Sequence, residues 1–231
     1  MPAKPSPSAN THIALPPSGK GKSVLVIHAW WGLNDFFKGV CDRLACEGFV
    51  AIAPDLFEGQ VATTIASAKR LRARPKREPT YKTLIRAVEQ LTNHPAVQGS
   101  NIGVVGFSMG GHWALWLSQR PELPISATVT FYGARAGDYT GGRAAFQGHF
   151  AEKDDWVSEA ALKKLQKSIE AAGCAAEFSS TPTLAIGSLS QTGPTPTISR
   201  PQSWRGNELS SFFRGISRNR PKRGLKNDEK V

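Results

Sequence analysis

The chain has 231 residues, 40% of them hydrophobic, which is enough to bury one sizeable core and predicts a single domain of ordinary size. Three cysteines make an odd number without metal-type spacing, which argues against a disulfide framework and favours a reducing, cytoplasmic compartment. The formal net charge of +11 invites a nucleic-acid interpretation, but more than half of the excess lies in residues 200–231 and no basic run has the periodicity of a recognition helix, so we expect no nucleic-acid partner.

The N-terminal part, residues 1–22, is rich in proline, serine and glycine and lacks the hydrophobic segment of a signal peptide, so we expect a flexible arm. No apolar stretch of the chain approaches the length that crosses a bilayer, and we therefore expect no membrane association. The first strong element follows at 23–30, where "SVLVIHAW" is apolar throughout and typical of a strand buried on both faces.

Strands and helices then alternate along the chain. Apolar runs predict strands at 49–54, 101–108, 126–133 and 144–150, and helical patterns occupy 35–47, 81–91, 109–119 and 158–172. The basic run "KRLRARPKR" at 69–77 lies between two helical patterns and is interpreted as a solvated loop. The alternation predicts an α/β fold, a three-layer sandwich in which helices cover both faces of a mainly parallel sheet.

This pattern ends at Phe178. From Ser179 onward the chain has no helical period, no alternation, and many serine, threonine, proline and glycine residues. We therefore expect the folded domain to cover residues 23–178 and residues 179–231 to form an irregular basic tail. On this interpretation the sheet has lost its last strand and its closing helix.

The stretch "GFSMGG" at 106–111 carries the chemistry that the sequence marks most clearly. It contains the pattern G-x-S-x-G between a predicted strand and a predicted helix, which is the context of a nucleophile elbow. Ser108 is the candidate nucleophile, and the backbone N–H of Met109 is a candidate donor for half of an oxyanion hole. The alternative is a plain strand-to-helix turn in which Ser108 only caps the helix.

The loop after the first long strand, "HAWWGLND", should supply the second half of that oxyanion hole. The N–H of Trp30 or Trp31 is the candidate, with the two indoles forming the wall of a dry substrate pocket. Core packing of both tryptophans is the alternative. His28 ends a buried strand, and we interpret it as a hydrogen-bonded structural histidine.

Three stretches together resemble the dienelactone hydrolase family, a branch of the α/β-hydrolases: "VLVIHAWWGLNDFFKGVCDRLACEGFVAIAPDLFEG", "NIGVVGFSMGGHWAL" and "GHFAEKDDWVSEAALKKLQKSIEAAG". The family usually has a cysteine where this chain has Ser108 and a glutamate where it has Ala29. Both departures fit a serine nucleophile that relies on a histidine base. The resemblance implies an α/β-hydrolase fold, hydrolysis of a small-molecule ester or lactone, and no metal or organic cofactor.

The resemblance also implies that Asp154 is the acid of the catalytic triad, with Asp155 as runner-up. The alternative is that the two aspartates only open the helix at Ser158. In α/β-hydrolases the order along the chain is serine, acid, histidine. All five histidines of this chain precede Asp154, so we expect the base to be missing; they are His12, His28, His94, His112 and His149. His112 and His149 are weak substitutes, because one opens the elbow helix and the other lies in a predicted strand.

A shift of reading frame explains both the missing histidine and the loss of pattern. With suitable synonymous codons, "SSTPTLAIGSLSQTGPTPTI" can encode Ile-Tyr-Pro-Asn-Thr-Gly-His-Trp-Phe in another frame, with the histidine codon spanning Ala185 and Ile186. We hypothesise a frameshift in the gene or its reported sequence at or just before Ser179. The chain is then a serine hydrolase with impaired turnover; the alternatives are a catalytically inactive homologue that at most binds a ligand, and a genuine tail that binds an acidic partner.

Overall fold

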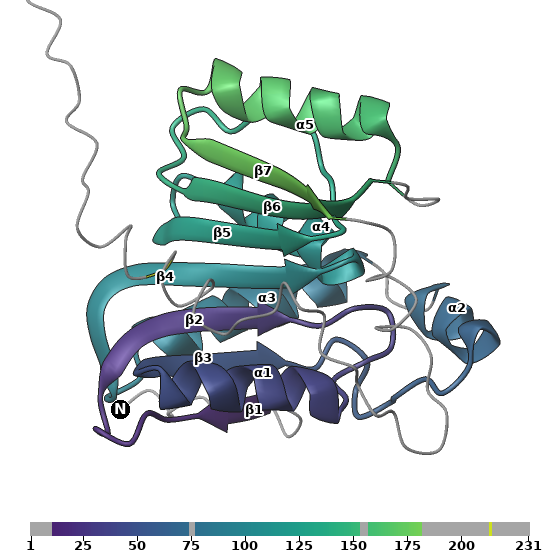
Figure 1. The fold of residues 1–231 in the computed structure, drawn as a ribbon. Coiled ribbons are helices and arrows are strands. Elements are labelled where there is room, and N and C mark those ends of the chain that lie inside the picture. The colour runs from purple at the N-terminus through teal and green to yellow at the C-terminus, as the bar shows by residue number, and fades with distance from the viewer. Residues whose placement is uncertain (1–10, 74–76, 153–156, 182–212, 214–231) are drawn as a thin grey trace, which may run out of the picture.

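A computed structural model describes residues 11–73, 77–152, 157–181 and 213 of the chain. Within these residues, seven strands form one sheet in the order β1-β3-β2-β4-β5-β6-β7 (Figure 1). β1 runs antiparallel to β3, and every other neighbouring pair is parallel, as the sequence predicts. The strands are β1 (Thr11–Ala14), β2 (Gly21–Ile27), β3 (Phe49–Pro54), β4 (Val97–Phe107), β5 (Ile125–Phe131), β6 (Ala145–Ala151) and β7 (Ala176–Thr181).

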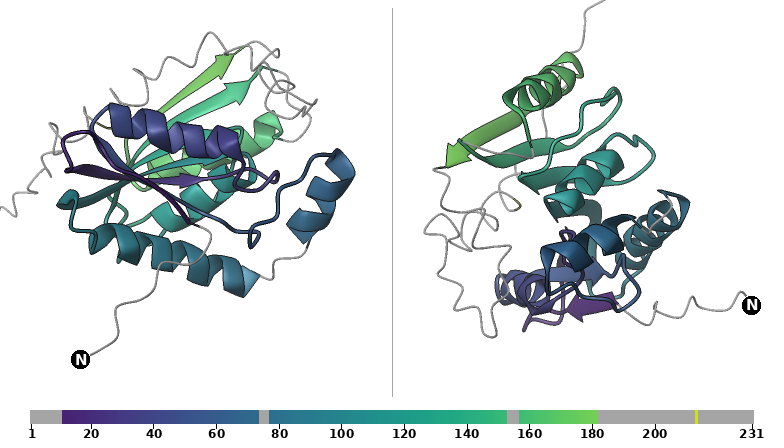
Figure 2. Two further views of the ribbon diagram at one scale, coloured as in Figure 1. Left: turned by 90° about the horizontal axis from the view of Figure 1, so that it is seen from below. Right: turned by 90° about the vertical axis from the view of Figure 1, so that its right-hand side faces the viewer.

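Helices cover both faces of this sheet. α1 and α3 lie on opposite sides of it (Figure 2). On one face Phe37 of α1 packs on Phe107 of β4, with ring centroids 5.4 Å apart. On the other face Ser118 of α4 lies 2.6 Å from the hydroxyl of Thr128 in β5. The helices are α1 (Asp35–Cys46), α2 (Ile65–Ala73), α3 (Arg77–Thr92), α4 (Met109–Ser118) and α5 (Glu159–Ala171).

The three-layer α/β prediction is confirmed, but the two edge strands were not predicted. β1 lies within the expected flexible arm, and β7 stands where the last strand was expected to be lost. An edge strand pairs on one side only and is partly open to solvent, so it does not need a continuous apolar sequence. The run Ala176–Thr181 therefore pairs in register with β6 although it contains Glu177 and Ser179.

The described part of the basic run at 69–77 is helical and not the expected loop, while residues 74–76 lie outside the described residues. Residues 65–73 form α2, and Arg77 begins α3. Ala68 and Leu71 are one turn apart and buried, so this helix presents a small apolar face to the core while its lysine and arginine side chains face solvent. No helix among the described residues is long and apolar enough to cross a membrane.

Beyond Thr181 the structure describes a single residue, Phe213, and it belongs to the core. Its side chain is 5% exposed, and its ring lies 6.1 Å from that of Phe49. A Cβ at Gly103 of β4 would come within 2.6 Å of the Phe213 ring, so the missing side chain of this glycine makes the space that the ring fills. The expected irregular tail thus contributes one residue, Phe213, to the core, and the other residues of 182–231 lie outside the described residues.

Parallel strands bring the ends of β2, β4, β5 and β6 to one edge of the sheet. The loop of residues 28–34, the single residue Ser108 and the loop of residues 132–144 all begin there. Ligands of open α/β sheets bind at this carboxyl edge, so the sheet topology places the candidate site.

Candidate active site

A single residue, Ser108, joins strand β4 to helix α4. Its backbone has φ 52° and ψ −111°, a conformation that residues with a Cβ rarely adopt. The sharp turn predicted from "GFSMGG" is thus observed, and the Ser108 side chain is exposed at the edge of the sheet. Ser108 occupies the N-cap position of α4 but makes no side-chain capping hydrogen bond, so the interpretation as a plain cap lacks its characteristic contact.

The glycines around Ser108 are required by close backbone contacts. A Cβ at Gly106 would overlap the carbonyl of Gly110, and a Cβ at Gly110 would overlap the carbonyls of Ile27 and His28. A Cβ at Gly133 would lie 2.7 Å from the carbonyl oxygen of Ser108. The spacing of the motif therefore lets β4, α4 and the end of β2 meet without side chains between them.

The same contacts bring the start of α4, where Met109 lies, against the end of β2. Met109 is the first residue of α4, where a backbone N–H has no acceptor in a preceding turn. Ile27 pairs with Gly106, so Ala29 stands level with Ser108 two residues further along each chain. The loop that contains Trp30 thus leaves β2 directly beside the start of α4.

The two tryptophans of this loop differ in burial. Trp31 is 4% exposed and packs in the core, whereas Trp30 is only partly buried. Their rings meet edge to face with centroids 5.7 Å apart. Core packing thus applies to Trp31, the candidate pocket residue, and Trp30 is the more accessible of the two.

The candidate acids Asp154 and Asp155 lie outside the described residues. Their neighbours are described: β6 ends at Ala151, and α5 begins after Ser158. The hydroxyl of Ser158 accepts a hydrogen bond of 3.2 Å from the N–H of Ala161, so this serine caps the helix. The N-cap of α5 is thus Ser158, and the alternative that Asp154 and Asp155 only open this helix also concerns residues outside the described ones.

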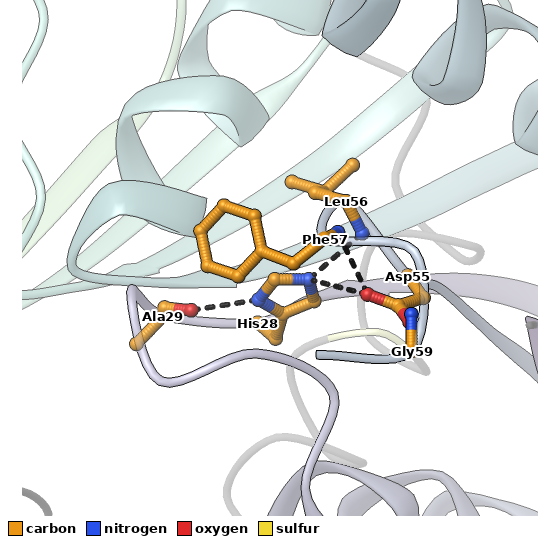
Figure 3. Close-up of polar contacts among 6 residues, drawn as sticks. All are labelled: His28, Ala29, Asp55, Leu56, Phe57 and Gly59. Carbon is orange, nitrogen blue, oxygen red and sulfur yellow. Dashed lines mark hydrogen bonds and ion pairs between the residues drawn. The ribbon is translucent and has the colours of Figure 1, made fainter. Parts of the chain in front are cut away.

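Among the described residues 11–73, 77–152 and 157–181, no histidine forms a hydrogen bond with the side chain of Ser108. His12 lies 2.9 Å from Asp42, and His94 accepts from the N–H of Ala96. His28 is fully buried, as expected of a structural histidine: its Nδ1 lies 2.6 Å from the Ala29 carbonyl, and its Nε2 accepts from the N–H of Leu56 (Figure 3).

His112 lies closest to Ser108 along the chain, on the first turn of α4. Arg135 donates to its Nε2 at 2.6 Å and uses its own Nε to bind Gln119 at 2.9 Å. Burial, together with the positive charge of Arg135, lowers the pKa of His112. The imidazole is therefore neutral, and the nitrogen that would accept a proton is occupied. Sequence reasoning missed Arg135, because no motif marks the loop after β5.

His149 lies in β6, two strands away from β4. Its ring stacks on that of Phe131 with centroids 4.6 Å apart, and Phe131 in turn stacks on Phe107 at 5.0 Å. Nδ1 of His149 is 3.0 Å from the hydroxyl of Ser179. The ring of Phe131 thus lies between this histidine and Phe107, the residue that precedes Ser108.

The described residues hold no group of three or more His, Cys, Asp or Glu side chains suited to a metal ion. The described residues of this part of the fold offer a strained, exposed serine at the start of a helix, where the first backbone N–H groups have no acceptor in a preceding turn. Acyl transfer at a carbonyl group uses these elements.

Similar proteins indicate the family to which this chain belongs. A protein from Aquifex pyrophilus, Protein usf, is 38% identical over 129 residues, which are 53% of this chain and 55% of the relative. A relative from Aquifex aeolicus, provisionally named carboxymethylenebutenolidase, is 36% identical over 124 residues, 51% of this chain and 53% of its own length. The chain thus spans about half the length of these curated relatives.

Solved structures share the fold. A dienelactone hydrolase-like promiscuous phosphotriesterase from metagenomic libraries superposes with a TM-score of 0.62 at 24% identity, covering 71% of both chains. A thermophilic esterase from Thermogutta terrifontis superposes with a TM-score of 0.63 at 17% identity, covering 88% of this chain and 87% of its own. The profile of the dienelactone hydrolase family matches residues 9–185, a range that includes the serine turn and the sheet around it. The chain therefore belongs to the dienelactone hydrolase family, with the α/β-hydrolase fold.

Proposed function

We propose that this chain is a hydrolase of small carboxylic esters or lactones that transfers the acyl group to Ser108. The observation that carries the proposal is the backbone of Ser108, held at φ 52° between β4 and α4. Backbone strain of this kind costs about 1–3 kcal/mol and persists where the surrounding structure enforces it, as at nucleophile elbows. Membership of a hydrolase family supports the same reaction class.

The reaction has two steps. The Oγ of Ser108 forms a bond to the carbonyl carbon, and the electron pair of the C=O bond moves to oxygen, which the N–H groups of Met109 and Trp30 stabilise. Collapse of this intermediate breaks the ester C–O bond, and the proton that Ser108 lost passes to the leaving oxygen, which becomes the alcohol or, in a lactone, the hydroxyl of the opened ring. Water then attacks the acyl-enzyme: its hydroxyl group stays with the acid that is released, and its other proton returns to the Oγ of Ser108.

Turnover of this chain should be strongly impaired. The Ser108 proton needs an acceptor, and of the described histidines His112 and His149 are both held by other residues. Removing one member of a triad typically costs several powers of ten in rate and leaves residual catalysis from the oxyanion hole. The same observation favours a second candidate, an inactive homologue that binds an ester-like ligand.

Hydrolysis of p-nitrophenyl acetate by the purified chain tests the proposal. We expect a slow release of nitrophenolate that Ser108→Ala abolishes. Ser100→Ala is the matched control, because Ser100 is an exposed serine on the same strand and its loss should leave the rate unchanged. A rate that survives Ser108→Ala contradicts the serine mechanism, and no rate above buffer favours the inactive homologue.

A further inference from the structure

We propose that His28 is a positioning residue that aims the Trp30 N–H into the site. The inference rests on the proposed function, in which that N–H is an oxyanion donor. His28 does not touch the reacting atoms. It acts through the peptide bond between Ala29 and Trp30.

The hydrogen bonds of the imidazole define its protonation. The N–H of Leu56 can only donate, so Nε2 of His28, 3.0 Å away, is an unprotonated acceptor. Nδ1 then carries the proton of the neutral ring and donates it to the carbonyl oxygen of Ala29 at 2.6 Å. Each ring nitrogen thus has one partner, and the two bonds require the Nδ1–H tautomer.

The bond to Ala29 fixes a peptide plane. In a trans peptide the C=O and N–H bonds point in opposite directions, and no cis peptide occurs among the described residues. Since the Ala29 carbonyl points at the His28 ring, the N–H of Trp30 points away from it. The Gly32 N–H donates to the same carbonyl at 3.2 Å, so a tight turn holds the plane from its other side.

Two aromatic rings and a carboxylate also surround the imidazole of His28. Its ring meets Phe57 edge to face at 5.2 Å and Phe37 of α1 at 6.1 Å. The carboxylate of Asp55 lies 3.8 Å from Nε2 and accepts from the N–H groups of Phe57, at 2.8 Å, and Gly59 (Figure 3). Complete burial lowers the pKa of His28, although the hydrogen bond to Ala29 and the charge of Asp55 oppose the shift, so the ring is neutral.

Two substitutions separate positioning from simple support of the fold. The side-chain nitrogen of asparagine is attached where Nδ1 is attached, so His28→Asn can still donate to the Ala29 carbonyl but loses Leu56. The amide of glutamine reaches the place of Nε2, so His28→Gln can accept from Leu56 but loses Ala29. Each variant deletes one of the two hydrogen bonds and keeps the other.

The two variants should differ in the rate of Ser108-dependent nitrophenolate release. This rate is obtained by subtracting the rate of Ser108→Ala. We expect His28→Gln to lower kcat by about 10²–10³ with little change in KM, the usual loss when one oxyanion donor is removed. His28→Asn should stay within about tenfold of the parent, since the peptide plane is kept. Thermal unfolding of both variants checks that they are folded to a similar extent.

A spectrum of the parent chain gives a readout that does not depend on turnover. Long-range ¹H–¹⁵N correlation at neutral pH should show His28 as the neutral Nδ1–H tautomer. The Nε2–H tautomer or an imidazolium overturns the inference directly. Equal kcat in the two variants, with a parent rate that Ser108→Ala abolishes, overturns it while the proposed function stands. A parent rate equal to that of Ser108→Ala instead removes the proposed function.

Discussion

Arg135 and His112 are joined by a hydrogen bond of 2.6 Å from the guanidinium to Nε2, which ties the loop after β5 to the first turn of α4. A guanidinium has donors only, so the imidazole nitrogen must be the acceptor. The histidine nearest to Ser108 in sequence is therefore committed to a structural contact. This contact holds the loop and α4 together, and it occupies the His112 nitrogen that would otherwise accept a proton.

Arg135→Met should raise the pKa of His112. The substitution removes a positive charge and a donor to Nε2 but leaves the burial of the ring, so we expect the pKa of His112 to rise while staying below its ordinary value. Titration of the His112 ring signals by NMR measures it. Arg86→Met, on the exposed surface of α3, is the control and should leave the pKa of His112 unchanged. An unchanged value in Arg135→Met would contradict the described contact.

Gly106→Ala should destabilise the fold, because the new methyl group meets the backbone carbonyl of Gly110, which cannot move without unwinding the start of α4. We expect a loss of about 3 kcal/mol in the free energy of unfolding, measured with urea. Gly39→Ala adds the same methyl group within helix α1, where nothing lies within 4 Å, and should stabilise by up to about 1 kcal/mol. Equal effects at the two positions would refute the packing argument for the elbow.

The contact of Phe213 with Gly103 predicts a non-additive pair of substitutions. Phe213→Ala should cost about 3 kcal/mol of stability, since the ring is buried. Gly103→Ala should also destabilise the parent, because its Cβ would come within 2.6 Å of the ring, but it should cost far less once Phe213 is alanine. Urea unfolding of the parent, the two single variants and the double variant measures the coupling. Strictly additive losses would contradict the contact between Phe213 and Gly103.

Most central elements of the fold were predictable from the sequence because they are apolar over nearly their whole length. β3 is buried at every position, and the run "FVAIAP" predicts its bounds of Phe49–Pro54 without error. β1, β7 and α2 were missed for one physical reason: an edge strand or a peripheral helix buries one side only and carries a mixed sequence. Burial of Phe213 depends on a space left by Gly103, which lies 110 positions away in the chain, and no local pattern signals it.

The candidate site was likewise predictable only in part. The turn at Ser108 was predictable because the glycine spacing and the change from strand to helix agree. The partners of His28 and His112 were not, since Leu56 and Arg135 come from other loops and meet these rings only when the sheet assembles. The roles of Ser108, Met109, Trp30, Trp31 and Asp154 stay predictions.

His28 should make the stability of the fold depend on pH. Its pKa is lowered in the folded chain, so the unfolded chain binds more protons as the pH falls below about 6.5. Stability is therefore lost as the pH falls from about 6.5 towards the folded-state pKa, by at most about 1.4 kcal/mol per pH unit. Urea unfolding from pH 7.5 to pH 5 should show this slope in the parent and less of it in His28→Asn. Identical slopes would mean that His28 is protonated in the folded chain.

Ser108 lacks a histidine base in the chain as written, because all five histidines precede Asp154. We propose a shift of reading frame at or just before Ser179, and determining the gene's sequence from the codon of Glu170 to the stop codon tests it. A shifted frame places a histidine at the codon that spans Ala185 and Ile186, shortly after β7 ends at Thr181. β7 runs parallel to β6, so this strand ends at the edge of the sheet where Ser108 lies.

The corrected chain should then turn over p-nitrophenyl acetate at least about 10³-fold faster than the present chain, because a histidine restores the proton acceptor for Ser108. Replacing that histidine by alanine is the control, and it should return the rate to the present level. If the DNA agrees with the present frame throughout, no histidine follows Asp154, the frameshift is ruled out, and the inactive homologue becomes the better account of this chain.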